Sequence, residues 1–251
     1  MTNNDKPPYI SGPADASTGR PATFVFLHGY GDDAEGLPLG LAQQFQWYNK
    51  LPYLKWVLPN APFNPASASR AWYQPKALPN SLKPRVPGQE DEEAAGQEPD
   101  DEDGILRACD LLDAYVAEEI EKGTPKERIV VGGFSQGCAI SLVWGVIGKQ
   151  RNNVAGVVCC SGYFPLAERI AELKRERGIE EGDKDSKKWF YIHGSKDMLV
   201  PTSLFTRGKE ELGKWIGEGE LEEHLYEGMG HSTNNNLLRD LLGFLTQVVP
   251  P

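Results

Sequence analysis

The chain has 251 residues, of which 39% are hydrophobic and 25% are charged, as is usual for a soluble globular protein with one sizeable core. A net charge of −10 argues against a nucleic-acid-binding protein, because such a protein needs a basic face. No apolar run reaches the roughly 20 residues of a membrane span, and the polar start of the chain is unlike a secretory signal.

The first third of the chain predicts an edge strand, two further strands and one helix. Residues 1–20 are rich in proline, glycine and serine, and we expect an N-terminal arm with an edge strand near Tyr9. A strand over 22–27, a helix over 37–48 and a strand over 54–58 should follow. Residues 61–103 lack periodicity. Their acidic part, from about 80 to 103, is expected to be a loop or a lid insertion.

From residue 104 onward, strands and helices alternate regularly. Because strands joined by right-handed helical crossovers run parallel, this order predicts a mainly parallel sheet with helices on both faces. We expect one α/β domain over 1–251, with no second-domain boundary. The predicted helices are 104–122, 136–148, 165–177, 202–216 and 232–248, and the predicted strands are 128–133, 154–160, 189–192 and 221–226.

The sharpest chemical signal is Gly133-Phe134-Ser135-Gln136-Gly137, which matches the pattern G-x-S-x-G between a predicted strand and a predicted helix. In an α/β hydrolase this turn exposes a nucleophilic serine above the sheet, and the crowded positions two before and two after it must be small. Ser135 is therefore the predicted nucleophile. Ser161 also lies near a strand end but lacks this spacing.

A serine hydroxyl needs a base, and the base needs an acid to orient it. In this fold the chain order is serine, acid, histidine. His231 is the predicted base because it lies in a glycine-flanked loop after a strand, and Asp197 is the predicted acid because it follows the strand before that. The order or the local context disfavours His28, His193 and His224 as base, and Asp183 and Asp185 as acid.

The oxyanion hole requires one backbone N–H from the residue after the nucleophile and another from the loop after an early strand. The first donor is predicted to be Gln136. The loop Leu27-His28-Gly29-Tyr30-Gly31-Asp32 makes Tyr30 the predicted second donor. His28 is expected to organise that loop rather than to take part in catalysis.

Taken together, these residues resemble the acyl-protein thioesterase/lysophospholipase family, also called the phospholipase/carboxylesterase family. The resemblance implies hydrolysis of a thioester or ester with one apolar acyl chain, on acylated proteins or lipids, without metal or cofactor. A groove for that chain is expected at the loop ends. The matching segments are 26–32, 132–137, 193–201 and 226–232, and the expected groove residues are Leu37, Trp72, Tyr73, Tyr163, Phe164 and Leu199.

The cysteines indicate where the protein is located, and two alternative functions stay open. The four cysteines lie in apolar or helical contexts without zinc-ligand spacing, so we expect reduced buried thiols and a cytoplasmic protein. The early cysteine that some family members acylate is absent, so at most transient membrane contact is expected. A general short-chain carboxylesterase that does not act on proteins is the alternative function. A hydrolase fold retained only for binding is a weaker alternative.

Overall fold

The computed structural model describes residues 6–12, 20–65, 67–74, 100–180 and 187–251. Its centre is a seven-stranded sheet in the order β1-β3-β2-β6-β7-β8-β9, in which β1 pairs antiparallel with β3 and the other neighbours pair parallel. The mainly parallel sheet and the edge strand near Tyr9 are thereby confirmed. The strands are β1 Tyr9–Ser11, β2 Ala22–Leu27, β3 Leu54–Leu58, β6 Ile129–Phe134, β7 Gly156–Cys160, β8 Lys188–Gly194 and β9 Leu221–Tyr226.

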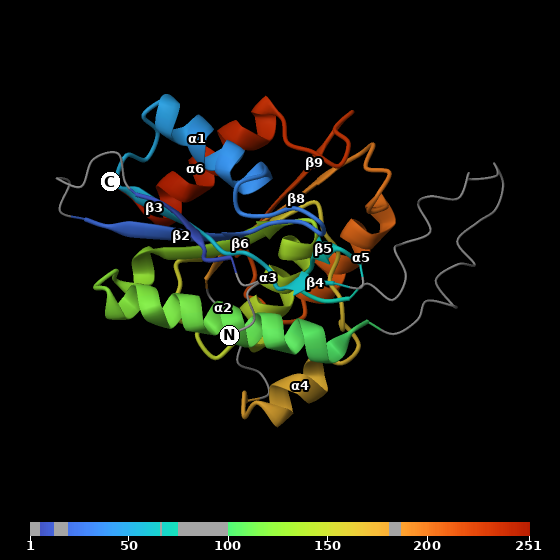
Figure 1. Cartoon of the computed structure of the whole chain (residues 1–251). Coiled ribbons are helices and arrows are strands. Elements are labelled where there is room, and N and C mark those ends of the chain that lie inside the picture. The colour runs from blue at the N-terminus through green and yellow to red at the C-terminus, as the bar shows by residue number, and fades with distance from the viewer. Residues whose placement is uncertain (1–5, 13–19, 66, 75–99, 181–186) are drawn as a thin grey trace.

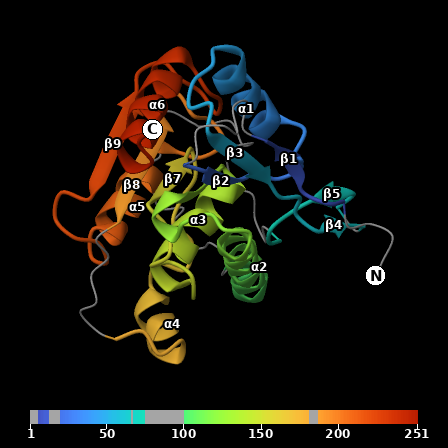
Figure 2. The ribbon, with the colours of Figure 1, turned by 90° about the vertical axis from the view of Figure 1, so that its left-hand side faces the viewer.

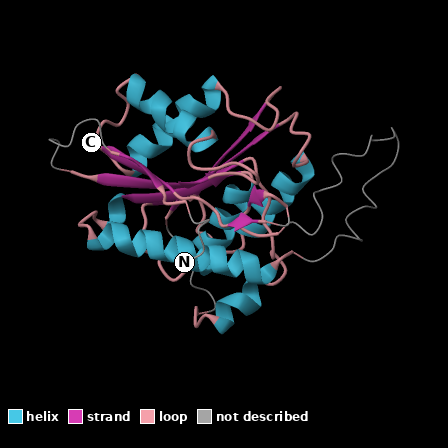
Figure 3. Ribbon diagram, viewed as in Figure 1, coloured by secondary structure: helices cyan, strands magenta, loops and turns pink. Residues whose placement is uncertain are grey.

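Helices cover both faces of this sheet, as Figures 1 and 3 show. One face carries α1 and α6. The other carries α2, α3 and α5, and α4 packs on α3 at the far side of that layer, which Figure 2 shows from the end. The helices are α1 Leu37–Trp47, α2 Glu102–Glu121, α3 Gln136–Ile147, α4 Ile170–Glu176, α5 Thr202–Leu212 and α6 Asn235–Val248.

The two cores arise from the alternation of side chains along the buried strands. In β2, Phe24 and Phe26 belong to the cluster beneath α1 and α6, whereas Val25 and Leu27 belong to the cluster beneath α2 and α3. Every residue of α3 is buried, because this helix lies between the sheet, α2 and α4. The helix that follows Ser135 is therefore held rigidly in the centre of the molecule.

Three helix boundaries differ from the prediction, and two of the differences have an identifiable reason. α4 begins at Ile170 and not at residue 165, because Leu166 has a positive φ of 55° that no helix accommodates. α6 begins at Asn235 because the side chain of Asn234 accepts the N–H of Leu237 and caps the helix. α5 ends at Leu212, four residues earlier than predicted.

The stretch 61–103 contains structure that the missing periodicity did not reveal. A two-stranded hairpin pairs β4 (Phe63–Asn64) with β5 (Ser69–Arg70). Further on, Asp101 caps α2 by accepting the Gly104 N–H at 3.0 Å, and it also accepts the Gln74 N–H at 2.9 Å. Residues 80–99 of the predicted acidic loop lie outside the described residues.

The fold brings four loops to one edge of the sheet. β2, β6, β8 and β9 are parallel, so the segments that follow them emerge on the same side. Those segments carry Tyr30, Ser135, Asp197 and His231. Across the described ranges, no helix is both long and apolar enough to cross a membrane.

Candidate active site

Ser135 occupies a strained turn between β6 and α3. Its φ of 55° and ψ of −113° are unusual for a residue with a side chain, and its N–H donates to the Cys160 carbonyl at 2.8 Å. A Cβ on Gly133 would lie 2.4 Å from the Gly137 carbonyl carbon, and one on Gly137 would lie 2.4 Å from the Leu27 oxygen. Backbone thus crowds both positions, for the steric reason that the sequence pattern suggested.

Burial distinguishes Ser135 from its rival, Ser161. Ser161 also has a positive φ, of 53°, at the end of β7, but it is fully buried and its hydroxyl has no hydrogen-bond partner within the described part of the chain. Ser135 is partly exposed. A substrate therefore reaches Ser135 and not Ser161 without a rearrangement of the core.

Asp197 and His231 form a directed pair. Nδ1 of His231 lies 2.7 Å from Oδ2 of Asp197, while Oδ1 of Asp197 accepts the N–H groups of Leu199 and Val200, each at 2.9 Å. Because an ionised carboxylate only accepts, Nδ1 carries the proton and Nε2 is left as a proton acceptor. The imidazole lies 4.8 Å from the Phe134 ring, centroid to centroid, which places it beside the elbow.

Contacts between the loops after β8 and β9 hold this pair in place. The Lys196 N–H donates to the Met229 carbonyl at 2.9 Å, and the Gly228 N–H donates to the Ser195 hydroxyl at 2.9 Å. A Cβ on Gly194 would lie 2.2 Å from the Met229 oxygen. Glycine at 194 therefore lets the two loops pack closely enough for the carboxylate to reach the imidazole.

The charge state of Asp197 suits a role beside an imidazolium. Burial alone would raise the pKa of this carboxyl group, but the hydrogen bond from His231 and those from the Val200 and Leu199 backbone outweigh burial. The net pKa of Asp197 lies below its ordinary value. The group therefore stays ionised at neutral pH and can stabilise a positive charge on His231.

The other three histidines have structural partners. His28 is buried, its Nε2 accepts the Ala61 N–H at 3.0 Å and its Nδ1 donates to the Gly29 carbonyl at 2.7 Å, so it is a neutral organiser of its loop. His193 is buried and its Nε2 donates to the Val200 carbonyl at 2.9 Å. Burial lowers the pKa of both groups. His224 pairs with Glu222 on β9 at 2.9 Å.

The loop after β2 lies against Ser135. A Cβ on Gly29 would be 3.3 Å from Cβ of Ser135. Tyr30, the predicted second oxyanion donor, directly follows Gly29 in this loop. Neither the Tyr30 N–H nor the Gln136 N–H has an acceptor within the described ranges. Both groups are therefore available to a developing negative charge.

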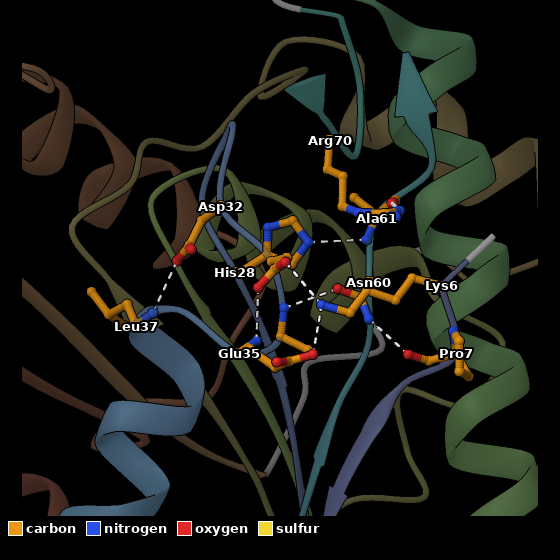
Figure 4. A network of polar contacts seen from close by, with 11 residues as sticks. Lys6, Pro7, His28, Asp32, Glu35, Leu37, Asn60, Ala61 and Arg70 are labelled. Atoms are coloured by element: carbon orange, nitrogen blue, oxygen red, sulfur yellow. Dashed lines mark hydrogen bonds and ion pairs between the residues drawn. The ribbon is translucent and has the colours of Figure 1, made fainter. Parts of the chain in front are cut away.

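A network of polar contacts fixes the shape of this loop and of the residues after it (Figure 4). Asn60 accepts the Ala34 N–H at 2.9 Å and donates to the Pro7 carbonyl at 2.7 Å, so it links the loop to the N-terminal arm. Asp32 accepts the Leu37 N–H at 3.1 Å, which joins the loop to the start of α1. These bonds hold the residues from Asp32 to Leu37, just beyond Tyr30, in place.

The six residues expected to line an acyl groove are only partly brought together. Trp72, Tyr73 and Phe164 are buried in the cluster beneath α2 and α3, and Tyr73 donates to the Tyr163 hydroxyl at 3.0 Å. Leu37 packs against the cluster on the opposite face of the sheet. Leu199 is 48% exposed. The groove assignment stays a prediction.

Two residues of the loops around the candidate site were not predicted from the sequence. Met198, beside Leu199, is 70% exposed on the loop that carries Asp197. Asp100 accepts the Tyr163 hydroxyl at 3.0 Å and the Leu166 N–H at 3.1 Å, so it ties the start of α2 to the loop after β7. Asp100 lay within a run of acids in which nothing marked it out, whereas the Met198-Leu199-Val200 run beside the acid was a usable signal. Within the described residues, no cluster of histidine, cysteine or acidic side chains could hold a metal ion.

Comparison with known proteins agrees with this geometry. The phospholipase/carboxylesterase family profile matches residues 14–249. The acyl-protein thioesterase 1 of Yarrowia lipolytica is 30% identical over 96% of this chain and 98% of its own length, and that of Mycosarcoma maydis is 33% identical over 91% and 92%.

Solved structures share the fold. Arabidopsis thaliana SOBER1 superposes with a TM-score of 0.69 at 24% identity, over 90% of this chain and 98% of that one. Zea mays acyl-protein thioesterase 2 gives a TM-score of 0.67 at 22% identity, over 96% and 98%. The α/β-hydrolase fold predicted from the elbow and the strand order is thereby confirmed. This chain is a serine hydrolase, and it belongs to the phospholipase/carboxylesterase family.

Proposed function

We propose that the protein is an acyl-protein thioesterase, which removes fatty acyl groups from protein cysteines and also accepts lysophospholipids. Ser135 is the nucleophile, His231 the base and Asp197 the acid. The backbone N–H groups of Tyr30 and Gln136 bind the oxyanion. The fungal relatives that match nearly the whole chain carry the name acyl-protein thioesterase 1, which supports this substrate class.

The mechanism follows from the directions of the hydrogen bonds. Nε2 of His231 takes the proton from Ser135 Oγ as the oxygen attacks the acyl carbonyl, and the two N–H donors bind the resulting oxyanion. The C–S bond then breaks, and the imidazolium gives its proton to the departing thiolate. Water, deprotonated by His231, hydrolyses the acyl-enzyme. This releases the fatty acid and regenerates the Ser135 hydroxyl.

The observation that carries the proposal is the 2.7 Å bond between Asp197 and His231 next to the strained Ser135 turn. The pair joins loops after two different strands, and it directs the free nitrogen of a partly buried imidazole away from the acid. A structural ion pair would need neither the strained serine nor the two unpartnered N–H groups beside it.

The surroundings of the site favour an apolar acyl chain. Tyr30, Met198 and Leu199 are 37%, 70% and 48% exposed, on the loops that carry an oxyanion donor and the acid. Large exposed apolar side chains beside a reactive group offer a surface for an acyl chain. Membrane contact in this proposal is transient and nucleic acid is not a partner, in keeping with the net charge of −10.

We place this activity in the cytoplasm, within lipid and fatty acid metabolism, and treat residues 1–251 as one domain. All four cysteines are buried and free, including the adjacent Cys159 and Cys160. Burial raises the pKa of the Cys109, Cys159 and Cys160 thiols, which keeps them protonated and unreactive. Such thiols suit a reducing compartment.

The nucleophile is tested with a fluorophosphonate probe. Wild-type protein should be labelled, Ser135→Ala should not be, and Ser161→Ala, which removes the buried rival hydroxyl, should be labelled like wild type. Labelling of Ser135→Ala at the wild-type rate would refute the assignment.

The substrate class is tested by comparing kcat/KM for an S-palmitoyl peptide, lysophosphatidylcholine and a short p-nitrophenyl ester at matched concentrations. Preference for the thioester supports the proposal. Preference for the short ester, with no turnover of the peptide, would identify a general carboxylesterase instead.

A further inference from the structure

Residues 70–74, which begin at the last residue of β5, run between the two arms of the oxyanion hole. We call this segment the strap. One arm is the loop after β2 that presents the Tyr30 N–H, and the other is the start of α3 that presents the Gln136 N–H. The strap is anchored to the hairpin side by the Ala71 N–H, which donates to the Pro62 carbonyl at 3.2 Å.

The strap bonds to the first arm on both sides of Tyr30. The indole N–H of Trp72 donates to the His28 carbonyl at 2.8 Å, and the Arg70 carbonyl accepts the Gly31 N–H at 2.9 Å. The Trp72 and His28 rings also lie 5.0 Å apart, centroid to centroid. His28, two residues before Tyr30, and Gly31, directly after it, are therefore bonded to the strap.

The strap bonds to the second arm through the side chain of Gln136 itself. Its Oε1 accepts the Trp72 N–H at 2.8 Å and its Nε2 donates to the Tyr73 carbonyl at 2.7 Å. Gln136 is buried, and so is Trp72. Trp72 therefore bonds to both arms.

We propose that Trp72 and the Gln136 side chain are positioning residues that set the spacing of the Tyr30 and Gln136 N–H groups. This inference rests on the proposed function, because it assigns those two N–H groups to the oxyanion. Oxyanion donors act over a narrow range, roughly 2.7–3.1 Å from the oxyanion. Trp72 and the side chain of Gln136 together form a bridge between the two arms. This bridge fixes the separation of the two N–H groups before substrate arrives.

A positioning role and an acyl-binding role for Trp72 predict different kinetics. Loss of an acyl-chain contact raises KM, because it weakens binding of the ground state and of the transition state alike. Loss of donor spacing acts only when the oxyanion forms, so kcat falls and KM stays.

The test replaces each half of the bridge and keeps the backbone donors. In Trp72→Phe, the indole N–H is lost and a ring remains; in Gln136→Met, a side chain of similar length loses both polar atoms. We expect kcat to fall about 10- to 100-fold in each, with KM within about twofold of wild type. The Ki of a trifluoromethyl ketone, which forms an oxyanion on Ser135, should rise by the same factor.

The matched control is Trp144→Phe. Trp144 is fully buried and lies in α3, well beyond the residues next to Ser135. Its indole N–H donates to Asp113 at 2.8 Å. The variant therefore loses the same kind of bond without changing either arm. Its kcat should equal that of wild type. A similar loss of kcat in Trp144→Phe, or an unchanged ketone Ki in both Trp72→Phe and Gln136→Met, would overturn the inference.

The outcomes also separate this inference from the proposed function. If wild-type Ser135 is not labelled by a fluorophosphonate, the proposed function fails. If it is labelled and both bridge variants keep wild-type kcat, only the positioning role fails. Should Trp72→Phe not fold, Gln136→Met decides alone, because its ketone Ki and kcat must change together.

Discussion

Replacing Asp197 by asparagine should remove most of the activity, because the structure dictates how the new amide must lie. Oδ1 of Asp197 accepts two backbone N–H groups, from Leu199 and Val200, and Oδ2 accepts Nδ1–H of His231. An asparagine has one acceptor atom and one donor atom for these two places. One of the two sets of partners must face an N–H₂ group.

The two backbone N–H groups of Leu199 and Val200 decide which set of partners faces the N–H₂ group. Turning the amide nitrogen toward Leu199 and Val200 would lose one part-buried and one buried hydrogen bond at about 1 kcal/mol each, and would leave donors facing donors at a further cost of about 1–3 kcal/mol. The amide oxygen therefore stays with the loop, and the N–H₂ group faces His231. Nδ1 must then accept, so the proton moves to Nε2 and His231 cannot take the proton of Ser135.

This preference of about 3–5 kcal/mol corresponds to a fall of about 10²–10⁴ in kcat/KM, measured with a thioester substrate at pH 7.5. The control is Asp240→Asn. The Asp240 carboxylate lies away from the site and accepts a hydrogen bond from the Tyr226 hydroxyl, with 3.0 Å between the two oxygens. This control variant should keep kcat/KM within about twofold of wild type. Activity of Asp197→Asn within tenfold of wild type would refute the reasoning about the tautomer.

Three further predictions concern stability. Gly137→Ala should lower the free energy of unfolding by more than about 3 kcal/mol in urea titrations, because the added Cβ meets the Leu27 backbone; a loss under 1 kcal/mol would contradict that clash. Ser161→Ala should raise the same quantity by up to about 1 kcal/mol, since it removes a buried hydroxyl without a partner; a clear loss would contradict this. Stability should also fall as pH drops below about 6.5, by up to about 1.4 kcal/mol per pH unit for each of His28 and His193. Burial lowers both pKa values, so the unfolded chain binds protons first; equal urea midpoints at pH 7.5 and 5.5 would contradict this.

Elements whose structure depends on residues close together in the sequence were predictable from it. β2 over Ala22–Leu27 matches its predicted range, since a buried run of apolar residues ending at a histidine and a glycine admits few alternatives. The elbow at Ser135 followed from the steric demand of its two glycines, which the close approaches at Gly133 and Gly137 explain. Such features depend on residues a few positions apart.

Features that depend on distant residues were not predictable in the same way. The β4–β5 hairpin has two-residue strands, too short for any alternation to show. The bridge between Trp72 and Gln136 joins positions 64 residues apart through a side-chain amide, and neither residue type signals the other. Leu37 was predicted to line the groove because it lies near a loop end, and the sequence did not show that it packs against the cluster beneath α1 and α6.

The bond between the Gln74 N–H and Asp101 has a consequence for how relatives of this protein can diverge. It joins two points of the fold that are far apart in sequence, and Asp101 is fixed in turn as the cap of α2. A relative that keeps both bonds keeps the end of the strap joined to the start of α2, whatever its sequence elsewhere.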